Sequence, residues 1–222
     1  ERHGWTLEVF DFPSRKTPPA LADFQLLVIM GGAMNIYQHR DHPWLVAEKE
    51  LIRQAIHAEL PIIGVCLGAQ LLSDALGGKV FQNPHHEIGW WPVDFTPEAR
   101  AIFPGLPASA VFLHWHGDTF TPPAGAIRVA ESTACAEQGF LWKDRVLALQ
   151  FHPEADERLA KEFCEDPGDH WPRGSWVQSP AHITSTAGPH SEIARKYLDV
   201  LLTGFFSRFE VTDAAPASPM DI

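Results

Sequence analysis

A strand that passes directly into a helix leaves this chain few ways to fold. The apolar run Ile62–Val65 indicates a buried strand, and a helical pattern over residues 67–76 begins immediately after it. Another apolar run, Leu26–Met30, ends at Gly31-Gly32 and is typical of a buried parallel strand. Apolar residues over 45–56 follow a helical period between the two strands. This order of elements predicts an α/β fold, an open and mostly parallel sheet with helices on both faces.

Short strand-like segments follow in the middle of the chain. They span residues 88–95, 110–116, 127–132, 136–142 and 146–151. Lys143-Asp144, between the last two, predicts a hairpin. The sequence therefore predicts a small region of antiparallel strands beside the parallel sheet.

The two ends of the chain give weaker patterns. We expect a strand over residues 5–10, helices over 156–164 and 192–209, and a proline-rich and glycine-rich loop over 165–190. Trp171 and Trp176 fall in that loop, where exposed aromatic side chains would suit a lid or a contact surface. No linker divides the chain, so we predict a single domain over residues 1–210 and a disordered tail over 211–222.

Composition excludes several classes of protein. The formal net charge is −11, which argues against a nucleic-acid partner and against docking on anionic lipid. No run approaches the roughly 18 apolar residues of a membrane span, and no secretion signal is visible. Three widely spaced cysteines, Cys66, Cys135 and Cys164, do not indicate a disulfide framework. We expect a cytoplasmic protein with no membrane partner.

The turn between the second strand and its helix has the residues of a nucleophile elbow. In Gly64-Val65-Cys66-Leu67-Gly68 the two glycines would relieve the crowding of a sharp turn. The central cysteine would stand at the carboxyl end of the sheet, where open α/β sheets bind their ligands. It would also stand at a helix N-terminus, where the partial positive charge favours a thiolate. The alternative is a small buried side chain in a turn.

A base for this cysteine follows the last predicted strand. In an extended chain, residues i and i+2 point to the same side, so His152 and Glu154 can touch. One imidazole nitrogen would meet the carboxylate, and the other would be free to take the Cys66 proton. Pro153 restricts the backbone between them. Cys66, His152 and Glu154 are therefore the predicted catalytic residues; a surface His–Glu pair is the alternative.

These motifs together resemble the class I glutamine amidotransferases. The stretches that match are Gly64-Val65-Cys66-Leu67-Gly68-Ala69-Gln70, Phe151-His152-Pro153-Glu154 and Met30-Gly31-Gly32. Two further stretches, Glu87-Ile88-Gly89-Trp90 and His114-Trp115-His116-Gly117-Asp118, are similar to the GMP-synthase-like branch. The resemblance implies the flavodoxin-like fold of the family. The family normally begins with a strand and a helix upstream of Trp5, so the resemblance implies that these elements are missing from this chain.

The resemblance also implies roles for individual residues. Cys66 would attack the γ-carboxamide of glutamine to give ammonia and a γ-glutamyl thioester, with His152 as base and then acid and Glu154 as its orienter. The implied oxyanion-hole donors and substrate-binding residues are the backbone N–H groups of Gly32 and Leu67, and Gly31, Gln70, Gly117 and Asp118. Ala33 departs from the family pattern, which often has proline there, so the oxyanion loop would be less rigid.

Metal and nucleotide sites are not expected. His114 and His116 alternate on one predicted strand, and His85-His86-Glu87 is another candidate, but twelve histidines make such coincidences common. We therefore predict no metal and no cofactor. Gly77-Gly78-Lys79 does not satisfy the spacing of a phosphate-binding loop, and the chain has no room for an ATP-using synthetase domain.

Three functions remain open at this point. The first is a hydrolase of glutamine, acting alone or with a separate synthetase subunit that accepts the ammonia. The second is a hydrolase of γ-glutamyl peptides or conjugates with the same triad, which differs only in the leaving group. The third is a non-catalytic regulatory subunit of a synthetase, which an intact triad argues against.

Overall fold

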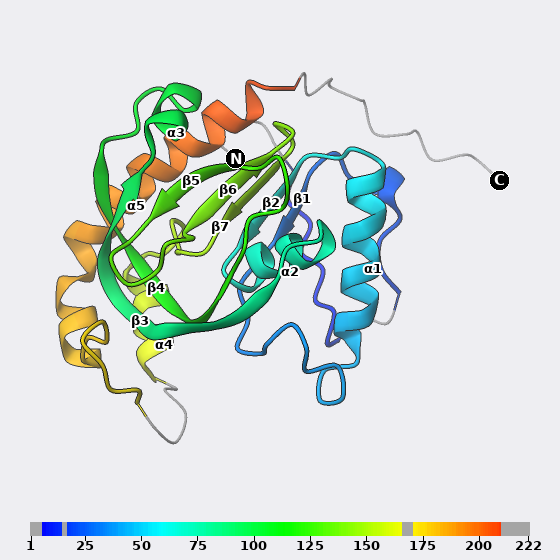
Figure 1. Ribbon diagram of the computed structural model, residues 1–222. Helices are drawn as coiled ribbons and strands as arrows, with labels where there is room; N and C mark the ends of the chain where they lie inside the picture. Colours follow the sequence, from blue (N-terminus) through cyan, green and yellow to red (C-terminus); the bar gives the residue numbers. More distant parts are fainter. Residues whose placement is uncertain (1–5, 15–16, 166–170, 210–222) are drawn as a thin grey trace.

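The described part of the chain forms one seven-stranded sheet with helices packed on both of its faces (Figure 1). The computed structural model describes residues 6–14, 17–165 and 171–209. The strands are β1 (Leu27–Ile29), β2 (Ile62–Val65), β3 (Val80–Phe95), β4 (Ser109–Phe120), β5 (Ile127–Glu131), β6 (Gly139–Trp142) and β7 (Val146–Leu149). The helices are α1 (Trp44–His57), α2 (Leu67–Ala75), α3 (Pro97–Ile102), α4 (Glu157–Glu165) and α5 (Pro180–Phe206), with a 3-10 turn at Leu21–Asp23.

The sheet has a parallel and an antiparallel part. Its strand order is β1-β2-β7-β6-β5-β3-β4. β1, β2 and β7 are parallel, and every later pair in that order is antiparallel. The predicted α/β class and the predicted combination of parallel strands with antiparallel ones are confirmed. The antiparallel part is larger than expected, because β3 and β4 are long and pair along nearly their whole length.

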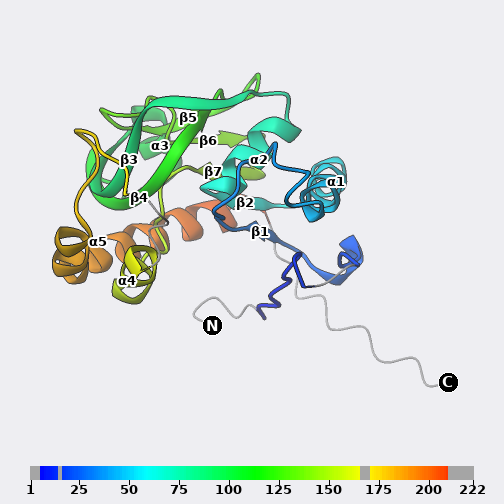
Figure 2. The ribbon, with the colours of Figure 1, turned by 90° about the horizontal axis from the view of Figure 1, so that it is seen from below.

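Alternation along the central strands explains why both faces carry helices. Val146 and Ala148 of β7 belong to the apolar cluster that includes α1 and α2. Leu147 and Leu149, between and after them, belong to the cluster that includes α5. Successive side chains of a strand point to opposite faces, so a run that is apolar throughout needs cover on both sides. Figure 2 shows α2 on one side of the sheet and α4 and α5 on the other.

The connection between β6 and β7 is the predicted hairpin. Lys143 and Asp144 both have positive φ, 49° and 57°, as the two central residues of a type I′ turn require. Trp142 and Val146 are paired on either side of it. This tight turn delivers β7, and the residues that follow it, to the middle of the sheet.

The strand predicted over residues 5–10 is wrong for the described residues 6–10, which are irregular; Trp5 lies outside the described residues. Leu7 and Val9 are 80% and 71% exposed. In the described residues, β1 is at the edge of the sheet and pairs with β2 alone. A segment with an alternating pattern forms a strand only when a neighbouring strand pairs with its backbone.

The loop predicted over residues 165–190 is wrong in its second half, since α5 begins at Pro180. The Ser179 side chain accepts from the His182 N–H, and proline is well tolerated in a first helical turn. Pro180 is therefore a poor indicator of a loop; Pro189 lies inside the same helix. Residues 166–170 and the predicted tail over 211–222 lie outside the described residues. Within the described part, no helix has the length and apolar character needed to cross a membrane.

Candidate active site

Cys66 occupies a strained turn between β2 and α2. Its φ of 53° and ψ of −108° are unusual for a residue with a side chain. The turn closes only because glycines flank it: a Cβ at Gly64 would lie 2.7 Å from the Gly68 carbonyl oxygen, and one at Gly68 would overlap the Ile29 carbonyl oxygen. The Cys66 N–H donates to the Leu149 carbonyl of β7 at 2.8 Å. The backbone around Cys66 therefore has the form that the nucleophile-elbow pattern predicts.

His152 and Glu154 touch as their spacing predicts. Nδ1 of His152 lies 2.7 Å from Oε1 of Glu154. The His152 ring is 3% exposed, and its backbone N–H donates to the Leu113 carbonyl of β4 at 2.8 Å. An ionised carboxylate can only accept, so Nδ1 donates and Nε2 is left for another partner.

The His152 ring interacts electrostatically with the Cys66 side chain as well as with Glu154. Nε2 is buried and has no hydrogen-bond partner among the described residues. Burial by itself lowers the pKa of His152, but the Glu154 carboxylate and the Cys66 side chain outweigh it and raise the pKa to about 10. Opposite charge close to an imidazole stabilises its protonated form. The surroundings of His152 therefore stabilise its protonated form. A histidine that acts as the base for a thiol must hold a proton in this way.

Aromatic side chains pack against His152 and Trp115. Phe163 of α4 packs edge-on against the His152 ring with centroids 5.3 Å apart, and against Trp115 at 5.1 Å. Trp171 packs on the other part of Trp115 at 5.4 Å, and Trp176 packs on Trp91 at 5.3 Å. Trp171 and Trp176 are half-buried, so the expected exposed aromatic surface is replaced by contacts that support the site. Sequence analysis missed Phe163, whose only signal is its place on the apolar stripe of an amphipathic helix.

The glycines after β1 lie directly against the proposed catalytic residues. A Cβ on Gly31 would be 3.2 Å from Cε1 of His152 and 3.4 Å from Cβ of Cys66. Gly32 lies beside Leu67, the first residue of α2. The structure therefore brings the two expected oxyanion-hole donors, Gly32 and Leu67, to the same edge of the sheet as Cys66.

Three of the expected substrate-binding residues, Gln70, Gly117 and Asp118, meet near the end of β4, whereas Gly31 lies against Cys66 and His152. The Gln70 side-chain amide donates to Oε1 of Gln150 at 3.1 Å and to the carbonyl of Asp118 at 3.5 Å. Gln70 is 5% exposed, so it supports the Asp118 backbone from within. The Asp118 carboxylate accepts from the Tyr37 hydroxyl at 3.1 Å. A polar cavity of about 350 Å³ opens here, lined by Asn35, Tyr37, Gln82, His86, Gly117 and Asp118.

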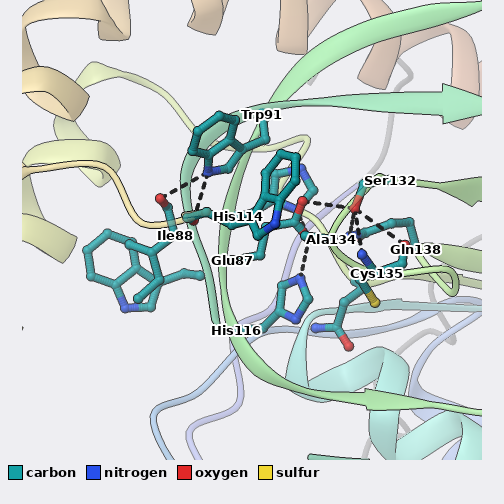
Figure 3. A network of polar contacts seen from close by, with 12 residues as sticks. Glu87, Ile88, Trp91, His114, His116, Ser132, Ala134, Cys135 and Gln138 are labelled. Atoms are coloured by element: carbon teal, nitrogen blue, oxygen red, sulfur yellow. Dashed lines mark hydrogen bonds and ion pairs between the residues drawn. The ribbon is translucent and has the colours of Figure 1, made fainter. Parts of the chain in front are cut away.

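A second polar cluster lies on β3 and β4 near this cavity. Glu87 of β3 and His114 and His116 of β4 place their ligand atoms within 4.8 Å of one another (Figure 3). The two histidines are a pair that the sequence singled out, whereas His85 and His86 of the other candidate set are exposed and only its glutamate joins the cluster. These three side chains have the chemistry to hold a metal ion, which strand spacing alone could not establish.

The sequence of the chain is similar to those of known proteins. The family model of the class I glutamine amidotransferases matches residues 2–166. The glutamine amidotransferase-like protein YfeJ of Salmonella typhimurium is 37% identical over 145 residues, which are 62% of this chain and 59% of that protein. One subunit of the glutamine-hydrolysing GMP synthase of Thermoplasma acidophilum is 33% identical over 132 residues, 59% of this chain and 63% of that polypeptide. The chain thus spans about three fifths of the length of these relatives.

Solved structures agree over more of the chain. The crystal structure of a glutamine amidotransferase from Thermotoga maritima has a TM-score of 0.81 at 30% identity and covers 92% of this chain and 88% of its own. A glutamine amidotransferase from Methylobacillus flagellatus has a TM-score of 0.80 at 28% identity, with coverage of 89% and 82%. The similarity in fold therefore extends to α5, the described helix beyond the region of the family model.

Proposed function

The chain belongs to the class I glutamine amidotransferase family, and from this premise we propose that it hydrolyses the γ-amide of glutamine through a thioester on Cys66. The observation that carries the proposal is a strained, buried cysteine that interacts electrostatically with a histidine whose Nδ1 is held 2.7 Å from a carboxylate. A buried cysteine in an ordinary turn would need neither the strain nor the pair.

The first half-reaction begins when a proton moves from Cys66 to His152. The Cys66 thiol gives its proton to Nε2 of His152, and the thiolate attacks the γ-carbon of the substrate amide. The carbonyl oxygen becomes an oxyanion, which the backbone N–H groups of Gly32 and Leu67 would receive; the loss of one such donor costs about 3 kcal/mol in other enzymes. His152 then protonates the leaving nitrogen, the C–N bond breaks, and ammonia departs.

The second half-reaction regenerates the cysteine. A water gives its proton to Nε2 of His152 and attacks the thioester carbon, the C–S bond breaks, and the proton returns to the Cys66 sulfur. The products are glutamate and a free enzyme, so one water is consumed for each ammonia released. Glu154 does not change its covalent state and acts by orienting and stabilising the protonated ring.

The amino-acid end of the substrate would lie at the end of β4. The backbone of Gly117 and Asp118 and the Asp118 carboxylate border the cavity of about 350 Å³. A carboxylate beside an open polar cavity suits the α-ammonium group of glutamine. Because Gln70 holds the Asp118 carbonyl, it would act on the substrate through this segment of β4 rather than by direct contact.

The test is a substrate panel on the purified chain. Glutamine, a γ-glutamyl dipeptide and a γ-glutamyl amine are supplied in parallel, and glutamate is measured together with ammonia or the released amine. We expect glutamate and ammonia from glutamine, and none of either from a Cys66→Ala variant that keeps the same melting temperature. Release from the γ-glutamyl compounds alone would replace glutamine hydrolysis by the conjugate hydrolase activity. No release from any substrate, with or without a synthetase partner, would favour the regulatory role.

A separate acceptor of ammonia is the second part of the proposal. Two relatives are named as single subunits of GMP synthase, and such a name implies a partner polypeptide for each of them. The comparable arrangement here would be a synthetase that docks near Cys66 and receives the ammonia. Co-purification from the native organism followed by a glutaminase assay with and without the partner tests it, and an unchanged rate would contradict it.

A further inference from the structure

Strand pairing places three buried metal-ligand side chains on one face of the β3–β4 ribbon. Glu87 is directly opposite His116 in the antiparallel register, and His114 comes two residues before His116 on β4. Residues two apart on a strand share a face, so all three point the same way. Glu87 and His114 are 0% exposed and His116 is 6% exposed. The cluster is therefore built into the sheet.

Two of the three separations in the cluster, those from the Glu87 carboxylate, are those of donors around one small cation, and all three ligand atoms lie within 4.8 Å of one another. Oε2 of Glu87 lies 3.2 Å from Nε2 of His116 and 3.4 Å from Nδ1 of His114. In a tetrahedral zinc site with bonds near 2.0–2.1 Å, neighbouring donors are about 3.3 Å apart. The carboxylate oxygen thus already stands at ligand spacing from both imidazoles.

His114 has weaker polar contacts than a buried imidazole ordinarily has. Neither of its ring nitrogens makes a hydrogen bond of ordinary geometry to the described residues, although the side chain is fully buried; its polar neighbours are the Trp91 backbone and the Glu87 carboxylate. Nearly all buried polar atoms in folded proteins are paired, and an unpaired one calls for a bound water or ion. Its Nδ1 faces the Glu87 carboxylate at 3.4 Å. A cation between them would satisfy this nitrogen.

The outer contacts of the cluster are those that surround protein metal sites. Nδ1 of His116 lies 3.0 Å from the carbonyl oxygen of Asp118. The Ser132 hydroxyl donates to Oε1 of Glu87 at 2.8 Å, and the Gln138 amide donates to Oε2 at 2.7 Å (Figure 3). Histidines that bind a metal commonly donate their second N–H to a carbonyl, and ligating carboxylates are themselves hydrogen-bonded.

We propose that Glu87, His114 and His116 form a binding site for one divalent transition-metal ion, with zinc as the ion that fits best. Two imidazoles and one carboxylate are a ligand set that zinc accepts, with the fourth position left to water. When the ion binds, the proton on Nε2 of His116 leaves to solvent and the nitrogen lone pair takes the metal.

The site would act as a structural clamp beside the active cysteine. Trp115 lies between the two histidines, and its carbonyl oxygen is 3.8 Å from Sγ of Cys66. His116 also holds the Asp118 carbonyl at the substrate end of β4. An ion that ties β3 to β4 here would fix the strand segment that borders both the nucleophile and the cavity.

The test is metal binding by the full chain without an affinity tag. The protein is stripped with a chelator and titrated with Zn²⁺ alone and with Co²⁺ alone. We expect one zinc per chain by elemental analysis, visible d–d bands of four-coordinate cobalt that zinc abolishes, and a higher melting temperature with zinc. His114→Gln should weaken zinc binding by about tenfold or more, whereas His85→Ala, an exposed histidine near the cluster, should not.

Two further measurements distinguish the proposed site from other zinc-binding groups and from a variant that fails to fold. Zinc can also bind a thiolate–imidazole pair, so the titration is repeated on Cys66→Ala, which should bind zinc as the unaltered chain does. If His114→Gln does not fold, the cobalt spectrum of Cys66→Ala decides the matter. Less than about one tenth of a zinc per chain, no cobalt bands, or equal binding by the folded His114→Gln variant would each overturn the proposal. These readouts do not depend on glutaminase activity, so the two proposals can fail separately.

Discussion

Glu154 reaches back across Pro153 to hold His152, with Oε1 2.7 Å from Nδ1 of a ring that is only 3% exposed. Local sequence supplies both partners, while β4 and α4 supply the rest of the environment of the ring. The Leu113 carbonyl takes the His152 N–H, and Phe163 covers the ring. The base is therefore oriented from three directions, and its geometry does not depend on substrate.

Glu154→Gln should separate two effects of Glu154 on His152, the orientation of the ring and the rise in its pKa. The amide keeps the size of the side chain but loses the negative charge that raises the pKa of His152, so the imidazole should titrate at lower pH in NMR spectra. We expect the glutaminase kcat to fall about tenfold or more, yet less than in His152→Ala, where the fall should be about 10²–10⁴-fold. An unchanged imidazole titration in Glu154→Gln would contradict the assigned role.

The same pair makes a prediction for stability against pH. The pKa of His152 is raised from 6.5 to about 10, so the protonated ring stabilises the fold fully below pH 6.5. That contribution is lost as pH rises through about 10. The difference in unfolding free energy between the unaltered chain and Glu154→Gln should be largest near pH 6 and should shrink toward pH 10. Urea denaturation at several pH values measures it; a difference that grows with pH would have the wrong sign.

Gly31→Ala should reduce activity with little loss of stability. The new methyl would stand 3.2 Å from Cε1 of His152 and 3.4 Å from Cβ of Cys66, and would push the two apart. Gly31 itself is exposed, so its surroundings at the surface can adjust. The matched control is Gly174→Ala, where the nearest atom, on Val177, is at an ordinary 3.7 Å. Comparison of kcat and melting temperature checks this; a Gly31→Ala variant as active as the control would contradict the close approach.

Gly68→Ala should instead prevent folding. Its methyl would overlap the carbonyl oxygen of Ile29, a backbone atom of β1 that no rotamer change can move. Overpacking against the backbone of a strand should cost about 3 kcal/mol or more of unfolding free energy. The soluble yield and the urea midpoint, again beside Gly174→Ala, test this. A folded variant within about 1 kcal/mol of the control would show that β1 and α2 are less tightly packed.

Glu48 gives a pH effect that is independent of the active site. Burial raises the pKa of this α1 carboxyl from 4.5 to about 7, and its Oε2 has no hydrogen-bond partner among the described residues. The fold therefore loses stability as pH rises from 4.5 to 7 and loses no more above that. Glu48→Gln should gain in melting temperature over the unaltered chain across this range, whereas the exposed control Glu50→Gln should not. An equal difference at about pH 4.5 and pH 8 would argue against the burial effect.

Local signals predicted the elements that position the nucleophile. Ile62–Val65 is a strand with the predicted bounds, and the glycine at 64 is required for the predicted reason, the crowding of a sharp turn. The Lys143-Asp144 hairpin is also confirmed. These interactions lie within a few residues along the chain, so the pattern contains them, whereas Gly68 is required by the close approach of Ile29 on β1.

The errors occurred where distant contacts decide. Leu7 and Val9 alternate like a strand, but in the described residues they have no neighbouring strand to pair with. The error at Pro180 is of another kind, because the Ser179 cap of the helix that Pro180 begins is a local signal. Phe163 on His152, and Glu87 beside His116, depend on contacts between elements far apart in the sequence. No local pattern shows such pairs.

The identity of the nucleophile is tested most directly by covalent labelling with a glutamine analogue. The purified chain is treated with 6-diazo-5-oxo-L-norleucine, digested, and mapped by mass spectrometry, with iodoacetamide as a measure of general thiol reactivity. The account predicts one analogue per chain, on Cys66 alone, with glutamine protecting the site and with Cys135 and Cys164 unmodified. Equal labelling of all three cysteines in the folded protein, or full glutaminase activity after Cys66 has been blocked, would contradict it.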